Sequence, residues 1–599
     1  MFNPKKYLTL FFLFTVLAPA SMLWGQNTYV PDDNFEQALI DLNYDDTLDD
    51  YVLTANISGV TSLDINNEGI SDLTGIEAFA ALTELRCYEN QLTSLDVSSN
   101  TALTELYCHS NSPGITSLNV STNTALTNLN CMGNQLTTLN VSNNTALTNL
   151  ECHYNQITSL DVSTNTALTH LECNNNELTN LDVNANTALT ELWCDWNQLT
   201  SLDVSANTAL THLECNNNEL TSLDVSANTL LEYLQCKGNQ FTSLDVSANT
   251  ALEYLRCQDN QLTSLDVSNN TALTHLETHD NSLTSLDISA NTALINLNCG
   301  NNQLTSLDVS SNTALTGMDC GSNSLTSLDV SANTALTNLR CLYNQLSTLD
   351  VSSNTALEYL TCQGNQFTSL NLSTNTALVQ LFCGHNQLTQ LDLSNNPILN
   401  RLYCYSNSLT TLDVSSNTAL TDLKCANNQL TSLDVSANTA LTHLEVHENQ
   451  LTSLDVSSNT ALRELVCASN PITALDVSSN TALTLLRCNT NQLTSLDVSS
   501  NTALGLLGCG NNQLTNLDVS NNTALTALHI EGNQLTYFNM KNGVTDELEY
   551  FTASNNSLTC IETLDPAYAT ANWTSANNNI DAGVTFDVIC GAAARTNWH

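Results

Sequence analysis

Apolar and polar residues alternate in short stretches along most of the chain, and one stretch of 21 residues recurs. Its first copy, Leu82–Ala102, reads LTELRCYENQLTSLDVSSNTA, and the cysteine returns in register as far as Cys509. Other residues replace the cysteine in a few copies, such as Thr278 and Val446, without disturbing the spacing. We count 23 copies over residues 82–558. Repetition at such a period is typical of a solenoid, in which each coil packs only against its neighbours.

Each copy has two similar halves, L-T-x-L-x-C-x-x-N and L-T-S-L-D-V-S-x-N. In each half a triplet, L-x-C or L-D-V, alternates between inward and outward side chains as a β-strand does, and a corner Asn follows. Neither half has the period of a helix. The pattern therefore predicts an all-β repeat solenoid of about 23 coils with two parallel sheets. Because strands on both sides would share a spacing of about 4.8 Å, we expect a nearly straight rod.

The first residues read as an export signal over residues 1–25. Lys5 and Lys6 precede an apolar run that is too short to span a bilayer, and small residues follow it. The signal contains no cysteine for a lipid anchor, and no second apolar segment of about 18 residues follows. We therefore expect a secreted or cell-surface protein without membrane insertion.

The two ends of the repeat array need caps, because an open solenoid exposes unpaired strand edges. Residues 26–81 are the predicted N-terminal cap, with a short helix over Phe35–Leu42 that Asp32 or Asp33 caps. Residues 559–599 are the predicted C-terminal cap. There Cys560 and Cys590 fall outside the 21-residue ladder and are candidates for a disulfide, with two free thiols as the alternative.

The charge of the chain excludes one class of partner. Only 12 Lys and Arg face 59 Asp and Glu, which gives a formal net charge of −47. Such a chain repels phosphate backbones, so nucleic-acid binding is not expected. Charged residues are 12 % and hydrophobic residues 42 %, a balance that predicts a folded protein rather than a disordered acidic tail.

The repeat resembles bacterial leucine-rich repeats of the nested 21-residue (IRREKO) type, with unit LxxLxCxxNxLxxLDLxxN, since the cysteine, both asparagines and the Leu-Asp pair all recur in register. The flanks Val30–Leu42 and Gly69–Leu82 resemble those of flavobacterial, internalin-like surface proteins. The resemblance implies secretion and protein interaction, and it supplies no catalytic residues.

The copies vary in only one of their halves. Between residues 82 and 530 every Lys and Arg, both tryptophans and nine tyrosines lie in the first half, while the second stays near LTSLDVSxNTA. Tyr, Trp and Arg dominate binding hot spots. We therefore predict that the first half binds an extracellular protein or glycan, with drift on a tolerant surface as the alternative. The predicted contact residues are Tyr154, Trp193, Trp196, Tyr233, Tyr254, Arg256, Tyr359, Phe382, Tyr403 and Tyr405, densest in the groups Tyr154–Trp193–Trp196, Tyr233–Tyr254 and Phe382–Tyr403–Tyr405.

The second half carries a column of aspartates, for example Asp96 and Asp161 through Asp350. One carboxylate per coil offers too few oxygens for a specific calcium site. We interpret the column as a solvated ladder and keep weak Ca²⁺ association as the alternative. The ladder cysteines contain no CxxC pair, so they are interpreted as small buried hydrophobes, and we predict no cofactor or structural metal.

Catalysis requires unlike groups that converge, whereas here the titratable groups form columns. We therefore expect a non-enzymatic monomer that acts as an adhesion or recognition scaffold. The alternatives are a passive structural spacer or matrix rod, an adaptor-type scaffold and, because Thr recurs in columns, ice binding.

Overall fold

The computed structural model describes residues 26–591. The chain forms two compact units, which divide between Leu189 and Thr190. The predicted export signal at residues 1–25 lies outside the described residues.

The first unit begins with a small cap. Strands β1 (Asn27–Tyr29) and β2 (Tyr51–Leu53) pair antiparallel and enclose helix α1 (Asp33–Asp41). The Asp32 carboxylate accepts hydrogen bonds from the backbone amides of Asn34 and Phe35, both at 3.0 Å, as an N-cap residue does. This confirms the predicted capped helix. A short helix α2 (Thr54–Ile57) and a 3₁₀ turn η1 (Ile76–Ala78) complete the cap.

The repeats of the first unit form a parallel ladder of three-residue strands. Neighbouring strands pair in register, with leucine opposite leucine, as Leu85 lies opposite Leu106. The strands are β3 (Ser62–Asp64), β4 (Glu84–Arg86), β6 (Glu105–Tyr107), β8 (Asn128–Asn130), β9 (Asn149–Glu151) and β10 (His170–Glu172). The ladder thus includes β3, which precedes residue 82.

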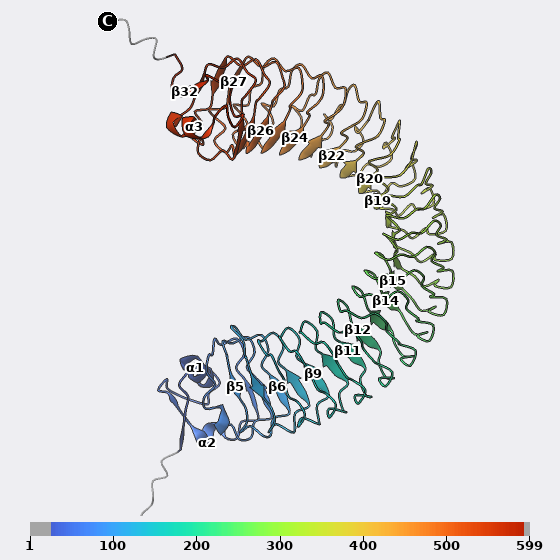
Figure 1. Cartoon of the computed structure of the whole chain (residues 1–599), viewed down its shortest axis with the longest axis vertical. Coiled ribbons are helices and arrows are strands. Elements are labelled where there is room, and N and C mark those ends of the chain that lie inside the picture. The colour runs from blue at the N-terminus through green and yellow to red at the C-terminus, as the bar shows by residue number, and fades with distance from the viewer. Residues whose placement is uncertain (1–25, 592–599) are drawn as a thin grey trace, which may run out of the picture. The chain divides into compact units, whose positions relative to one another are not determined.

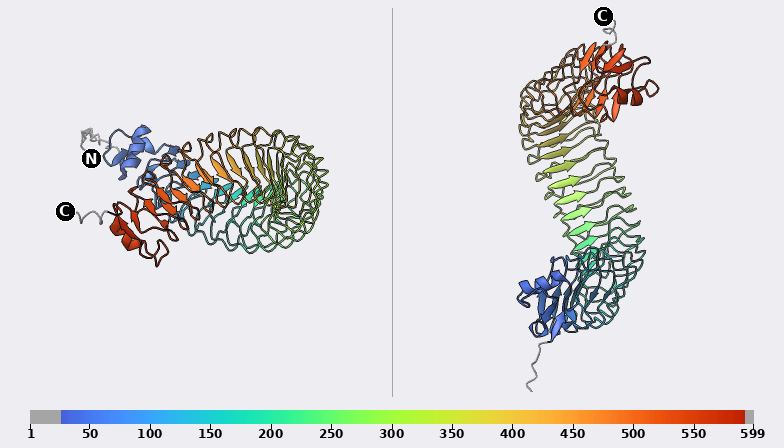
Figure 2. Two further views of the ribbon diagram at one scale, coloured as in Figure 1. Left: turned by 90° about the horizontal axis from the view of Figure 1, so that it is seen from above. Right: turned by 90° about the vertical axis from the view of Figure 1, so that its left-hand side faces the viewer.

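The second unit continues the same design (Figure 1), and its strands stack as one parallel ladder in Figure 2. The strands are β11 (Glu191–Trp193), β12 (His212–Glu214), β13 (Tyr233–Gln235), β14 (Tyr254–Arg256), β15 (His275–Glu277), β16 (Asn296–Asn298), β17 (Gly317–Asp319), β18 (Asn338–Arg340), β19 (Tyr359–Thr361), β20 (Gln380–Phe382), β21 (Arg401–Tyr403), β22 (Asp422–Lys424), β23 (His443–Glu445), β24 (Glu464–Val466), β25 (Leu485–Arg487), β26 (Leu506–Gly508), β28 (Ala527–His529) and β30 (Tyr550–Thr552). The predicted all-β solenoid is confirmed.

Each coil buries a small set of apolar side chains that only stacking seals from water. In the coil that begins at Leu103, the predicted inward residues Leu106, Cys108, Ile115 and Val120 are fully buried. At about 0.8 kcal/mol per buried CH₂ group, each added coil contributes several kcal/mol against the entropy of ordering its residues. Stability therefore comes from the contacts between coils.

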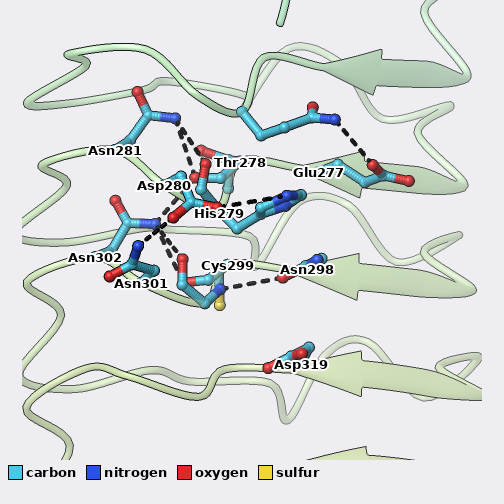
Figure 3. Close-up of polar contacts among 12 residues, drawn as sticks. Glu277, Thr278, His279, Asp280, Asn281, Asn298, Cys299, Asn301, Asn302 and Asp319 are labelled. Carbon is cyan, nitrogen blue, oxygen red and sulfur yellow. Dashed lines mark hydrogen bonds and ion pairs between the residues drawn. The ribbon is translucent and has the colours of Figure 1, made fainter. Parts of the chain in front are cut away.

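The asparagines bind the backbone at both corners of a coil. The Nδ2 group of Asn302 donates to the carbonyl oxygens of Thr278 in the preceding coil, at 2.9 Å, and of Cys299 in its own coil, at 3.2 Å (Figure 3). Its Oδ1 atom accepts from the amide of Leu283 at 2.9 Å. At the second corner Asn312 donates to Ile288 and to Asn291 across coils, both at 2.9 Å. The conserved spacing of the phrase therefore reflects backbone groups that would otherwise be left unpaired.

The second predicted sheet forms only near the ends of the described residues. Strands β5 (Leu95–Asp96) and β7 (Leu118–Asn119) pair in the first unit, and β27 (Asn516–Asp518), β29 (Tyr537–Asn539), β31 (Cys560–Glu562) and β32 (Thr585–Asp587) form a four-stranded sheet in the second. Elsewhere the L-D-V segments are not strands. There the coils are joined by asparagine side chains and by single backbone hydrogen bonds, so the second of the two predicted parallel sheets is present only in short stretches.

Taken by itself, the second unit follows an arc in Figure 1, with strands β11 to β26 along its inner side. The expectation of a nearly straight array assumed equal strand spacing on both sides. A continuous ladder of backbone hydrogen bonds fixes the spacing only in the strand half, whereas the second half has single backbone bonds between coils, such as that from the amide of Gln303 to the carbonyl of Leu283 at 2.9 Å. The other half is bridged by side-chain amides, such as Asn312 onto Asn291, which do not impose that spacing. The expectation of straightness is therefore not met in this unit.

The C-terminal end is closed by helix α3 (Pro566–Asn572) and a disulfide between Cys560 and Cys590, which the sequence predicted. Trp573 packs between Phe551, with ring centroids 4.4 Å apart, and Phe586, at 5.9 Å. Between residues 26 and 591, none of the helices is both long and apolar enough to cross a membrane.

Candidate recognition surface

The outward side chains of the first half of each coil form a surface that we call the variable face. It consists of the two residues that flank the central strand leucine and of the residues from the ladder cysteine to the corner Asn. In β14, for example, Leu255 is fully buried while Tyr254 and Arg256 point outward and are half-buried. Strand alternation thus places the variable residues on one side of the ladder.

The residue before the first corner Asn is left-handed in every copy, with positive φ at all 23 such positions from Glu89 to Asn555. Glycine and asparagine tolerate this conformation best, whereas a bulky side chain there is unusual. Three copies nevertheless carry a large aromatic residue at this position, which we call the turn aromatics: Tyr154 (φ 52°), Trp196 (φ 50°) and Tyr343 (φ 48°).

The turn aromatics are also among the most exposed large side chains of the described residues. Tyr154 is 59 % exposed, Trp196 58 % and Tyr343 49 %. Tyr154 belongs to the first unit, whereas Trp193 and Trp196 belong to the second. The sequence prediction included Tyr154 and Trp196 but missed Tyr343, although comparison of the copies at the position before the corner Asn would have found it.

Tyr233 and Tyr254, predicted as a pair, lie on neighbouring strands with ring centroids 5.3 Å apart. The stack continues to His212 on one side, at 5.7 Å, and to His275 on the other, at 4.2 Å with nearly parallel rings. Because each ring covers the next, this stack offers ring edges and polar groups to a partner rather than open ring faces.

In the third predicted group, Phe382 and Tyr403 stack at 4.5 Å, and the Nζ group of Lys424 lies 5.1 Å from the centre of the Tyr403 ring. The Tyr403 hydroxyl donates to a carboxylate oxygen of Asp422 at 2.6 Å. Burial, and then this acceptor, raise the pKa of Tyr403. Tyr405 does not join the stack and instead meets the ring edge of His385 at 5.1 Å.

The remaining predicted residues occupy other strand positions of the variable face. Trp193 is half-buried in β11, and Tyr359 is 38 % exposed at the start of β19. The guanidinium Nε of Arg256 pairs with Glu277 at 3.1 Å. The structure therefore distributes the predicted residues over several clusters rather than one continuous patch.

The variable face also contains a buried acidic pair that the sequence did not single out. Asp195 is buried, its carboxyl group shares a hydrogen bond with that of Glu214, and it accepts the amide of Asn216 at 2.6 Å. Burial, and then the charge of Glu214, raise the pKa of Asp195 to about 7. Burial also raises the pKa of Glu214, so the two carboxyl groups titrate together rather than independently.

Small residues at some positions leave two hollows on the variable face of the second unit. One, of about 370 Å³, lies over Ala426 and is bordered by Tyr405, Lys424 and His447. The other, of about 460 Å³, lies over Gly317 and Met318 and is bordered by Arg256 and Arg340. Hollows of this size accommodate one side chain or one sugar ring of a partner.

The opposite face presents the aspartate column to solvent. The carboxylate of Asp308, for instance, accepts the amide of Ser310 at 2.9 Å. The Ser310 hydroxyl, followed by its amide, lowers the pKa of Asp308. No three His, Cys, Asp or Glu side chains within residues 26–591 are placed to hold a metal ion. The column thus consists of single carboxylates that are each engaged by their own coil.

All 19 ladder cysteines are buried free thiols, as the interpretation of small buried hydrophobes requires. Burial raises the pKa of Cys299 to about 12. At neutral pH these thiols remain protonated, and a protonated thiol is a poor nucleophile and a poor metal ligand.

The fold of this chain is similar to that of solved proteins. No protein-family model matches the chain. The ectodomain of the plant membrane receptor kinase GASSHO1/SCHENGEN3 from Arabidopsis thaliana, solved in complex with Casparian strip integrity factor 2, superimposes with a TM-score of 0.63 at 21 % identity. The superposition covers 85 % of this chain and 74 % of that chain, and that ectodomain is built of leucine-rich repeats. This chain is a leucine-rich repeat protein.

The sequence of this leucine-rich repeat protein is similar to that of the internalins. It is 43 % identical to Internalin J of Listeria monocytogenes over 78 residues, a stretch that covers 12 % of this chain and only 8 % of that protein. The functional domain of InlJ from Listeria monocytogenes, described as including a cysteine ladder, is 36 % identical with a TM-score of 0.48, over 70 % of this chain and 79 % of that chain.

Proposed function

We propose that this leucine-rich repeat protein is a non-enzymatic, extracellular recognition scaffold that binds a protein or glycan partner through its variable face. The turn aromatics are the observation that carries this proposal. An aromatic residue at a left-handed position costs about 1–2 kcal/mol more than glycine would. Such cost persists mainly where function requires it.

The distribution of residues favours binding over drift. Drift would fill the left-handed position with residues that suit it, such as Asn175, Asn217 or Gly238, which occupy it in other copies. Trp196 and Tyr343 are instead large, exposed and mounted on a fixed ladder. A rigid, exposed aromatic residue loses little conformational entropy on contact, which is the property of a binding hot spot.

The relatives support the same function. The plant receptor ectodomain was solved with a bound partner, and Internalin J provides the sequence likeness. Together with the export signal expected at residues 1–25, these likenesses support a secreted or cell-surface location. N-terminal sequencing of the exported chain tests this location, since cleavage between residues 20 and 26 is expected.

The test of binding replaces Trp196 and Tyr343 with asparagine, which other copies place at the same left-handed position. Full-length chain and the W196N/Y343N variant are compared on protein arrays, on glycan arrays and on neighbouring cells. We expect at least about a tenfold loss of affinity, the effect of removing hot-spot side chains. The matched control is Thr490→Asn, which makes the same replacement at a left-handed position without an aromatic residue.

Two results would count against the proposal. Equal binding by the wild type and the W196N/Y343N variant would exclude the turn aromatics as contacts. A wild-type chain that binds nothing on any array or cell would favour the passive spacer. The adaptor-type scaffold predicts several simultaneous partners, and ice binding predicts thermal hysteresis, so both alternatives have their own readouts.

A further inference from the structure

The hollow over Ala426 lies between two ring-bearing side chains on neighbouring coils. Tyr405, Ala426 and His447 occupy the same position in three successive copies, directly after the ladder cysteine or its replacement. The amide of Ser406 donates to Ala426, and that of Asn427 donates to His447, both at 2.9 Å, so the three coils stay in register here. Two strand spacings separate the outer residues by about 9.6 Å. We call this space the Ala426 slot.

The slot is open because Tyr405 leans away from it. A Cβ atom on Gly384, in the preceding coil, would lie 3.1 Å from the Tyr405 ring, so the ring rests over that glycine. The Tyr405 hydroxyl also donates to Oε1 of Gln363, two coils away, at 3.4 Å. The ring is thus held towards β20, and the space over Ala426 remains unfilled.

The polar groups around the slot include donors, on Ser406, Lys424 and Asn427, as well as acceptors. Glu445 and Glu448 border it with carboxylates, and the Nδ1 atom of His447 is buried with no hydrogen-bond partner in the described structure. The ammonium group of Lys424 is already paired with Glu445 at 2.8 Å. A ligand that brings donors would therefore find acceptors available.

The local charge is negative. The ionisable side chains on the variable face of β21 to β24 and their turns include four carboxylates, Asp422, Glu445, Glu448 and Glu464, against two cations, Arg401 and Lys424, which leaves a charge of −2. The whole chain carries −47. Both values favour a cationic group over a neutral sugar or an anion.

From this geometry we propose that the Ala426 slot binds the guanidinium group of an arginine side chain on a basic protein partner. A guanidinium group is planar, carries five N–H donors and no acceptor, and stacks on aromatic rings. The slot has a volume of about 370 Å³, and Tyr405 and His447 are among the residues that border it. The inference rests on the proposed function and names the chemistry of the partner at this place.

The experiment uses the full chain and a small probe, N-acetyl-arginine methylamide, observed by saturation-transfer NMR at millimolar concentration. We expect saturation transfer to the guanidinium-bearing side chain, and a weaker effect for the lysine and citrulline analogues, which lack the planar cation. The variant Ala426→Leu fills the slot and should lower the signal at least about fivefold. Leucine is accommodated at this position elsewhere, as Leu342 shows.

The matched control is Asn489→Leu, which places leucine at the same repeat position three coils further on, with Ala468 rather than a slot residue in the preceding coil. It should leave the signal unchanged. An equal signal from the wild type and Ala426→Leu would overturn the proposal, as would displacement of the probe by a neutral methyl glycoside, which would assign the slot to a glycan. Because the test of the proposed function changes Trp196 and Tyr343 instead, failure of one does not imply failure of the other.

Discussion

The corner asparagines allow a quantitative prediction, and Asn344 is the best case because it is buried and fully hydrogen-bonded. Its Oδ1 atom accepts the amide of Leu325 at 2.9 Å. Its Nδ2 group donates to the carbonyl oxygens of Cys320, Cys341 and Leu342 at 3.0–3.3 Å. We predict that Asn344→Ala destabilises this part of the array strongly.

The magnitude follows from which groups lose their partner. The carbonyl of Cys320 keeps a bond from Asn323, and that of Cys341 keeps one from Asn365, so their loss is minor. The amide of Leu325 has no other acceptor among the described residues and becomes a buried orphan, at a cost of about 1–3 kcal/mol. With the three lost donations, the free energy of opening these coils should fall by about 3 kcal/mol.

Hydrogen exchange measured by mass spectrometry is the suitable assay, because repeat arrays open locally and a single unfolding midpoint would average many coils. A change of about 3 kcal/mol accelerates exchange at Leu325 roughly a hundredfold. Asn338→Ala, on an exposed strand position of the same coil, should change exchange by less than about 0.5 kcal/mol. Equal exchange in Asn344→Ala and Asn338→Ala would refute the reasoning.

The variant Asn344→Asp tests the direction in which stability should change with pH. Its carboxylate would face three carbonyl oxygens where the amide donated, so its folded pKa should be raised above the unfolded value of about 3.9. A raised folded pKa gives stability that is present at low pH and lost as the pH rises through that pKa. Asn344→Asp should therefore exchange faster as the pH rises, after correction for intrinsic rates, while the cost of Asn344→Ala stays constant.

Four further predictions follow from the described contacts. The pKa of Asp195 is raised to about 7, so the coils around it should lose stability as the pH rises from about 4 through 7, and Asp195→Asn should abolish this dependence in hydrogen exchange. The ladder thiols, such as Cys299, should resist alkylation at pH 8 in the native chain and react after unfolding. Cys560→Ser should destabilise the C-terminal cap by up to about 3–4 kcal/mol, and peptide mapping without reductant should recover Cys560 joined to Cys590. Added Ca²⁺ at fixed ionic strength should leave the thermal midpoint unchanged, and a rise would revive calcium binding by the aspartate column.

The repeat, its strand half and both caps could be predicted because their signals are local and recur. Leucine spacing fixes the register, and Asp32 and Cys560 stand outside the repeated phrase. The short extent of the second sheet could not be predicted, since L-x-C and L-D-V have the same alternation. Their difference lies in the hydrogen bonds of Asp308, whose carboxylate accepts the amide of Ser310, and of Asn312, whose side chain bridges the coils. Periodicity does not report which atoms join one coil to the next.

Two glycines of the variable face lie beside large side chains of the next coil. Gly321 and Gly384 have no positive φ, so the backbone does not require glycine at either place. Each instead makes room for a neighbour. A Cβ atom on Gly321 would lie 2.5 Å from Leu342, and one on Gly384 would lie 3.1 Å from the ring of Tyr405. Gly300 is not matched in this way, because the residue at the same position of the next coil is Gly321. At Gly321 and Gly384, however, the shape of the variable face depends on the side chains of two neighbouring coils together.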